Sequence, residues 1–269
     1  MKTLVTGGTG TLGRLLIPLL READCDVRVL SRTRRANRAS VEFITGDLAT
    51  GEGIDAAVQG TETIVHCAGS STGDEDKARY LVRAASRAGV QHLIYISVVG
   101  ADRIPITSRI DRVMFGYFGS KGAAERVVAE SGLPWTTLRA TQFYDLILTV
   151  ARQLARLPII PVAAGFRFQP VDAGEVAARL AELVLGRPAG LMPDLAGPTT
   201  YEMADLLRSY LDVAQKHRPV LPVWFPGAAA KAIRAGANLA PQRAVGRRTW
   251  EDFLAGQPSP ASALRTVST

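Results

Sequence analysis

Short apolar segments alternate with longer amphipathic segments along the first 157 residues of the chain. The short segments are rich in Val, Ile and Leu, a composition typical of strands that are buried on both faces. We expect strands at residues 2–6, 26–30, 41–45, 63–66, 92–97 and 135–139. Because helical segments separate these strands, the pattern predicts a doubly wound α/β fold, in which helices cover both faces of a parallel sheet.

The segments between the strands place apolar residues at helical spacing, as Leu12, Leu16 and Leu20 do. We expect helices that contain residues 12–20, 56–58, 74–89, 117–132 and 143–157. Residues 101–116 contain Pro105 and a mixed charge pattern, which predicts an irregular connection rather than a helix.

The composition changes after residue 157, where proline and glycine become frequent. The pattern predicts helices at residues 172–185 and 201–211, a proline-flanked apolar stretch at 221–225 and an alanine-rich segment at 227–239. Asp172 and Thr200 are suitable residues to cap the two helices. We therefore divide the chain into residues 1–157 and a smaller α+β lobe, residues 158–269, which packs on the sheet as part of one continuous unit. A substrate pocket is expected between the two parts.

A glycine-rich turn connects the first expected strand to the first expected helix. Gly7, Gly8, Gly10 and Gly13 fit both Gly-x-Gly-x-x-Gly and Gly-x-x-Gly-x-x-Gly. Glycine permits a tight turn, lets the backbone approach a pyrophosphate and lets the helix pack closely on the strand. The N-terminus of the helix then attracts phosphate. This context predicts a Rossmann dinucleotide site; the alternative is a structural turn that binds nothing.

The residues after the second expected strand indicate which dinucleotide would bind. This strand ends beside the adenosine ribose in dinucleotide-binding folds, where an acid favours NAD and a basic residue favours NADP. Here Ser31 and Arg32 occupy the position, Arg34, Arg35 and Arg38 follow, and no carboxylate is present. Guanidinium groups pair well with a phosphate dianion, so NADP(H) is the expected cofactor. The alternative is a solvated basic loop without a ligand.

Two further strand ends carry candidate cofactor contacts. Asp47 follows the third strand and is placed either to accept a hydrogen bond from the adenine amino group or to cap the helix at residues 56–58. Ala68 and Gly69 follow the fourth strand, where small residues let a cofactor lie against the backbone.

His66 and Cys67, at the end of the fourth strand, are the residues that a metal site would use. However, no other His or Cys stands at ligand spacing, because His92 and His217 are isolated. We therefore interpret both side chains as packing at the strand end and expect no metal site.

Composition and charge argue against several other classes of protein. The net charge is +7 and the pI is about 9.8, but the sequence has no basic tail or repeat that would indicate nucleic-acid binding. Two cysteines are too few for a disulfide framework. No apolar run reaches the roughly 18 residues of a membrane span, and the first residues form a strand rather than a signal peptide. We expect a cytoplasmic monomer or homodimer that binds a small-molecule substrate, and neither a membrane nor nucleic acid.

Tyr117 and Lys121 are four residues apart at the start of an expected helix, so both side chains lie on one face. A free tyrosine has a pKa of about 10, and a neighbouring ammonium is expected to lower it. Tyr117 could then protonate a carbonyl oxygen, while Lys121 holds the nicotinamide ribose. The alternative is a surface Tyr–Lys pair in which Lys121 bridges to Glu125.

Together, these segments resemble the atypical short-chain dehydrogenase/reductases, and most closely their NmrA-like, NAD(P)H-binding branch. The resemblance rests on residues 6–13, 46–48, 97–100, 117–121 with Glu125, and 138–143. Residues 169–172 and 246–250 also look like those of bacterial members of that branch. It implies that NADP(H) lies along Gly7, Thr9, Gly10, Thr11, Leu12 and Gly13, with its adenosine phosphate on Ser31 and Arg32 and its adenine near Asp47 and Leu48. It also implies that the nicotinamide lies near Ala68, Gly69, Ser97, Lys121, Thr141, Gln142 and Phe143.

The sequence departs from the family at one catalytic position. Active relatives usually have Ser or Thr two positions after Ser97, where this chain has Val99. We expect an NADPH-dependent oxidoreductase that reduces a small carbonyl, quinone or enone, with Tyr117 and Lys121 as catalytic residues. Val99 favours the alternative of a non-catalytic redox sensor, and Arg32 argues against a third option, an epimerase. Trp224 and Phe225 are expected either to line the substrate pocket or to lie in a core.

Overall fold

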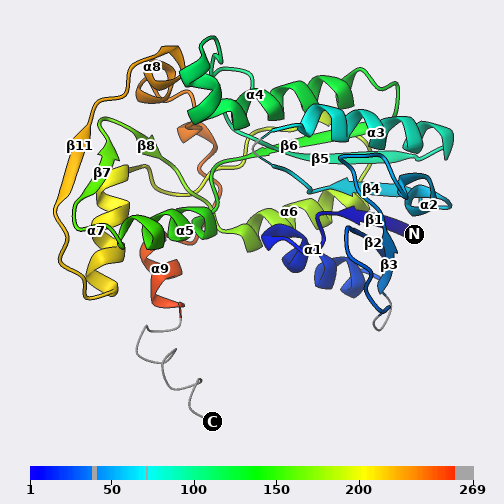
Figure 1. Ribbon diagram of the computed structural model, residues 1–269. Helices are drawn as coiled ribbons and strands as arrows, with labels where there is room; N and C mark the ends of the chain where they lie inside the picture. Colours follow the sequence, from blue (N-terminus) through cyan, green and yellow to red (C-terminus); the bar gives the residue numbers. More distant parts are fainter. Residues whose placement is uncertain (38–40, 71, 258–269) are drawn as a thin grey trace.

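The computed structural model describes residues 1–37, 41–70 and 72–257. Seven parallel strands form the central sheet in the order β3-β2-β1-β4-β5-β6-β9 (Figure 1). They are β1 (Lys2–Thr6), β2 (Asp26–Ser31), β3 (Val41–Thr45), β4 (Thr63–His66), β5 (His92–Val98), β6 (Trp135–Ala140) and β9 (Gly190–Leu191). The six strands expected from the apolar segments are thus confirmed, and the doubly wound sheet with them. The strand order reverses between β1 and β4, which is where ligands bind in folds of this kind.

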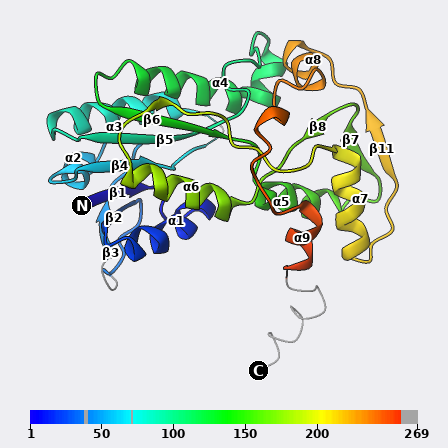
Figure 2. The ribbon, with the colours of Figure 1, turned by 180° about the vertical axis from the view of Figure 1, so that it is seen from behind.

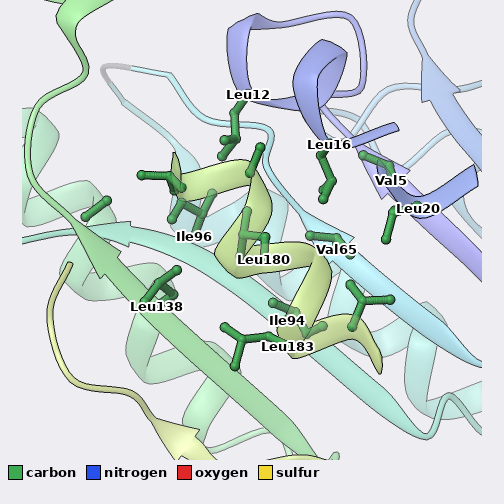
Figure 3. Close-up of a cluster of buried hydrophobic side chains, with 14 of the residues drawn as sticks. Val5, Leu12, Leu16, Leu20, Val65, Ile94, Ile96, Leu138, Leu180 and Leu183 are labelled. Carbon is green, nitrogen blue, oxygen red and sulfur yellow. The ribbon is translucent and has the colours of Figure 1, made fainter. Parts of the chain in front are cut away.

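Helices cover both faces of the sheet, as the periodicity predicts (Figure 1). One face is covered by α1 (Thr11–Glu22) and α6 (Ala173–Leu185), the other by α2 (Ile54–Val58), α3 (Asp74–Arg87) and α4 (Arg109–Ala129). Figure 3 shows side chains of α1 and α6 packed against the strands, and Leu16, Leu20 and Leu180 are completely buried there. None of the helices in the described ranges is long and apolar enough to cross a membrane.

A lobe built mainly from the C-terminal third lies beyond the carboxyl ends of the strands (Figure 2). Its elements are α5 (Tyr144–Leu154), β7 (Ile160–Ala163), β8 (Arg167–Phe168), β10 (Tyr201–Glu202), α7 (Met203–Val213), β11 (Val220–Val223), α8 (Ala228–Arg234), a 3₁₀ turn (Pro241–Arg243) and α9 (Trp250–Ala255). Strands β8 and β10 pair antiparallel, and β7 and β11 pair parallel. The helix α6 and the strand β9 belong to the central layers, although both follow residue 157 in the sequence. The division of the chain into two parts at residue 157 stays a prediction.

Three local predictions were wrong. The helix expected from Tyr117 begins eight residues earlier, at Arg109, because Ser108 and Asp111 form a capping box within the stretch expected to be irregular. Thr200 does not cap α7, whose N-cap is Glu202 without a side-chain hydrogen bond. Asp47 does not cap α2, which begins after Gly53 in a left-handed conformation. By contrast, Asp172 caps α6 as expected, accepting a hydrogen bond from the Gly174 amide at 2.7 Å.

Candidate functional site

The glycine-rich turn joins β1 to α1 with the close packing that its motif predicts. Gly7 has a φ of 70°, and a Cβ there would lie 2.6 Å from the amide nitrogen of Ala68, at the end of β4. A Cβ on Gly13 would lie 2.4 Å from the Cα of Gly8, so only glycine lets α1 pack on the turn. Gly10 is the N-cap of α1, without a side-chain cap or an acidic residue in the first turn. The backbone amides of Thr11 and Leu12 therefore keep the positive end of α1 free for a phosphate.

Basic residues follow the end of β2, where the adenosine ribose is expected. Arg32, Arg34 and Arg35 are exposed, and in the described part of the chain no acid lies within ion-pair distance of them. Ser31 is buried, and its hydroxyl donates to the Thr33 carbonyl at 2.8 Å, which fixes the turn that leads to Arg32. Arg38 lies outside the described residues.

The residues expected beside the adenine lie at the end of β3. Leu48 is buried in the core, and half-buried Asp47 uses its carboxylate to accept a hydrogen bond from the Ala49 amide at 2.9 Å. One carboxylate oxygen of Asp47 is thus used in the turn and the other remains available. The adenine contact stays a prediction.

Lys121 is buried at the carboxyl edge of the sheet, with only 3% of its surface exposed. Its Nζ atom lies 3.4 Å from Oδ2 of Asp74 and donates to the Ile96 carbonyl at 3.4 Å. A Cβ on Gly69 would lie 2.8 Å from the same Nζ, so glycine leaves the ammonium group accessible to this part of the edge. The alternative bridge from Lys121 to Glu125 is wrong: Glu125 instead makes two hydrogen bonds to Arg139, at 2.9 and 2.6 Å.

Asp74 is a functional candidate that the sequence analysis missed. It is fully buried in the first turn of α3, where Oδ1 accepts from the Ser70 amide at 2.9 Å and from Lys77 at 3.2 Å. Its own amide donates to Ser120 at 3.1 Å. Burial lowers the pKa of Lys121, and the Asp74 charge acts in the opposite direction. In the sequence, Asp74 could have been noticed as an acid at the start of the helix that follows Gly69. However, Glu75 and Asp76 lie in the same turn, and only the fold shows which of the three acids contacts Lys121.

Tyr117 lies next to Lys121 on α4, as the spacing predicts. The Lys121 ammonium lies 5.9 Å from the centre of the Tyr117 ring, and the Tyr117 side chain is 39% exposed at this end of the helix. The expected lowering of the Tyr117 pKa is wrong. Partial burial of the ring, followed by the Asp74 charge, raises that pKa to about 12. The phenol is therefore protonated at neutral pH.

Unpartnered polar atoms gather at the ends of β5 and β6, next to these groups. Buried without a hydrogen-bond partner among the described residues are the hydroxyls of Ser97 and Thr141 and both amide atoms of the Gln142 side chain. Ser97 alternates with Ile96 and therefore faces the same side of the sheet as α4. Phe143 precedes α5, and its backbone pairs with Val171. Unsatisfied buried polar groups cost free energy, so these residues fit a ligand with donor and acceptor groups such as a nicotinamide.

The side chains at the other expected positions are used in packing. Val99 is completely buried against Ala196 and Ala240 of the C-terminal third, so the position of the missing hydroxyl serves as an apolar contact. His66 is buried against Tyr95 and hydrogen-bonds to Thr6 at 2.7 Å, and burial lowers its pKa to about 3. The packing role expected for His66 is confirmed.

No group of three potential metal ligands occurs within the described ranges. Burial raises the pKa of the Cys67 thiol to about 12, which leaves it unreactive. Phe225 packs in the lobe core, as one of the two alternatives predicts, whereas Trp224 is 66% exposed, with the Arg234 guanidinium 3.8 Å above its ring.

Comparison with known proteins agrees with this arrangement. The sequence profile of the NAD(P)H-binding family matches residues 7–156. The NAD(P)H azoreductase of Xenophilus azovorans is 28% identical over 181 residues, which cover 65% of this chain and 60% of that protein. The chain spans about half the length of several other curated relatives that it matches.

Solved structures share the fold at low sequence identity. The NADPH-dependent quinone oxidoreductase of Escherichia coli, determined with NADPH, has a TM-score of 0.74 at 19% identity, covering 94% of this chain and 98% of that one. The UDP-glucose 4-epimerase of Thermus thermophilus, determined with NAD, has a TM-score of 0.68 at 19% identity, covering 96% and 100%. The glycine-rich turn, the parallel sheet and the matched profile thus assign the chain to the NAD(P)H-binding family, as an atypical short-chain dehydrogenase/reductase.

Proposed function

We propose that the chain is an NADPH-dependent oxidoreductase that reduces a small carbonyl, quinone or enone. The observation that carries this proposal is the buried Lys121–Asp74 pair, which lies with Tyr117 at the carboxyl edge of the sheet. The turn at Gly7 and the buried, unpartnered groups of Ser97, Thr141 and Gln142 provide a second support. They fit the two ends of a dinucleotide.

NADPH, when bound, supplies the hydride to the substrate. Tyr117 would donate its phenolic proton to the substrate oxygen and regain a proton from solvent, so that the substrate gains one hydride and one proton in total. The raised pKa of Tyr117, about 12, keeps the phenol protonated at neutral pH. Lys121 would hold the ribose hydroxyls of the nicotinamide end, and Asp74 would hold Lys121.

The first test is turnover by the Tyr117→Phe variant with NADPH and a panel of quinones, aldehydes, ketones and enones. We expect kcat to fall about 10²- to 10⁴-fold, the usual contribution of a positioned general acid, while the Kd for NADPH stays nearly unchanged. Tyr80, on α3, is equally exposed at 39%, so Tyr80→Phe is a matched control that should keep full activity. Undiminished turnover in Tyr117→Phe would remove this residue from the mechanism.

Arg32 is the residue proposed to distinguish NADPH from NADH. Loss of a charge-assisted contact costs about 1.5–3 kcal/mol, so Arg32→Ala should weaken NADPH binding about 10- to 100-fold. NADH binding should not change, because NADH lacks the 2′-phosphate. Arg21→Ala, at the opposite end of α1, serves as the control in the same fluorescence titrations. Equal losses for both cofactors would contradict the proposed role.

A redox sensor is the second candidate function, and the buried Val99 favours it. A sensor would bind NADPH much more tightly than NADP⁺ and transfer no hydride to any acceptor. Equal affinities for the two redox forms, together with turnover, would exclude it.

A further inference from the structure

One face of α4 continues from the core of the molecule to its surface. The face consists of Ile110, Met114, Tyr117, Lys121, Ala124 and Val128, each three or four residues from the next. At this spacing the six side chains point in the same direction from the helix. We call them the 110–128 face.

The two halves of the 110–128 face differ in exposure. In the second half Lys121, Ala124 and Val128 are 3, 0 and 1% exposed, because α3 and the sheet cover them. In the first half Ile110 and Met114 are 55 and 45% exposed. The apolar character of the face therefore continues past the point at which the protein stops covering it.

The uncovered half projects beyond the carboxyl edge of the sheet. A Cβ on Gly122 would lie 2.5 Å from the Ala101 carbonyl, three residues past the end of β5, so the part of α4 before Lys121 lies beyond the strand ends. There Phe115 and Phe118, on an adjacent side of the helix, pack in one cluster with Phe166 of the lobe. Figure 1 shows this end of α4 next to α8.

We infer that Ile110 and Met114 bind the apolar part of an uncharged ring-system substrate, such as an alkylated quinone, whose reducible carbonyl lies at Tyr117. This inference rests on the proposed function. The exposed stretch from Ile110 to Tyr117 ends at the candidate proton donor and is about 10 Å long at 1.5 Å per residue, which matches a small ligand. A stable protein interface needs roughly 800 Å² per partner, far more than these three side chains and the neighbouring exposed Val113 offer.

The charged groups of this stretch lie off the 110–128 face. Arg109 and Arg112 are exposed, but residues one or two positions from Ile110 do not share its side of the helix. Asp111 is the sole acid between Arg103 and Glu125, and it is fully buried, accepting hydrogen bonds from Ser108 and from the Ala229 amide. Glu125, the other carboxylate of α4, pairs with Arg139 at 2.6 Å, so neither acid is available to bind a cationic substrate. Methionine and tyrosine make favourable contacts with flat rings.

The test compares Ile110→Asn and Met114→Gln with Leu185→Asn in the full chain. Leu185 ends α6 and is 58% exposed, so it matches Ile110 in exposure. We expect kcat/KM for quinones with alkyl substituents to fall about 10-fold in the first two variants. This is the smallest effect usually seen when an apolar contact the size of one methylene group is lost. The unsubstituted quinone and the Kd for NADPH should be nearly unaffected, and Leu185→Asn should behave as wild type.

Direct binding separates this inference from the proposed function. The probe is 2-methylnaphthalene, which is not reducible here, titrated by fluorescence into NADP⁺-saturated protein. The inference is supported if the probe binds more weakly to the Ile110 and Met114 variants but normally to wild type and Leu185→Asn. This result would hold even if no acceptor is turned over and the proposed function fails. Unchanged binding and unchanged quinone selectivity overturn it, even where turnover persists. A wild-type dimer that Ile110→Asn converts to a monomer would assign the face to a second copy and also overturn it.

Discussion

At the scale of single residues, Asp74 determines the state of Lys121. A buried lysine favours its neutral form unless an anion lies nearby, and Asp74 provides that anion at 3.4 Å without any exposure to solvent. The same carboxylate also binds Lys77 and the loop at Ser70. One acid thus fixes the lysine and the start of α3, and it adds to the effect of burial on the raised pKa of Tyr117.

Replacing Asp74 with Asn should destabilise the protein in a pH-dependent way. Breaking a buried pair costs about 3–5 kcal/mol, measured by urea unfolding at pH 7. The loss of the Asp74 charge would lower the pKa of Lys121 further in the folded state. Between the lowered pKa of Lys121 and about pH 10, the unfolded chain then binds one proton more than the folded protein, so the stability of the variant rises with pH in this range. Part of the loss in free energy of unfolding should therefore disappear by about pH 9.5.

Asp76→Asn is the matched control for that measurement, because Asp76 lies in the same helical turn and is exposed. It should leave the free energy of unfolding within about 0.5 kcal/mol of wild type. Equal stability of the two variants at pH 7 would show that the Lys121–Asp74 pair has no energetic role.

At the scale of elements, the start of α4 connects the sheet to the lobe. Ser108 accepts a hydrogen bond from the Asp111 amide at 3.0 Å, and Asp111 accepts in return from the Ser108 amide at 3.1 Å. The second oxygen of Asp111 accepts from the Ala229 amide in α8. A capping box therefore sets the first turn of the helix that carries Tyr117 and positions α8 beside it.

Ser108→Ala should lower the free energy of unfolding by about 1 kcal/mol, the usual cost of losing an N-cap side chain. Ser209, inside α7, donates only to the Asp205 carbonyl of its own helix, so Ser209→Ala should cost little. Urea unfolding of both variants checks the difference. Equal stabilities would mean that the cap contributes nothing and that packing alone fixes the start of α4.

At the scale of the whole molecule, the positive charge belongs to one part of the chain. Residues 213–250 contain seven basic residues and no Asp or Glu, which equals the net charge of +7 of the whole protein. These basic residues are Lys216, Arg218, Lys231, Arg234, Arg243, Arg247 and Arg248. Charge of one sign raises the local concentration of oppositely charged ligands, so we expect this part of the chain to attract the phosphates of a dinucleotide.

The two parts of the chain should unfold together. The α6 helix packs on α1, and β9 pairs with β6, so the second half of the sequence completes the central layers. Far-UV circular dichroism and tryptophan fluorescence should give one coincident thermal transition. The fluorescence reports on both parts, because Trp135 lies in β6 and Trp250 is completely buried in the lobe. A fluorescence change that precedes the loss of ellipticity would indicate separate domains.

The sequence by itself determined the strands, the glycine-rich turn and the pairing of Tyr117 with Lys121, because each depends on neighbours within a few residues. Apolar runs specify buried strands, and a spacing of four residues specifies one helix face. Only the tertiary structure decided that Asp74 pairs with Lys121 and that Glu125 pairs with Arg139. It also decided that Val99 is an apolar contact. These outcomes depend on which strand ends and helices meet at one edge of the sheet, which local patterns do not encode.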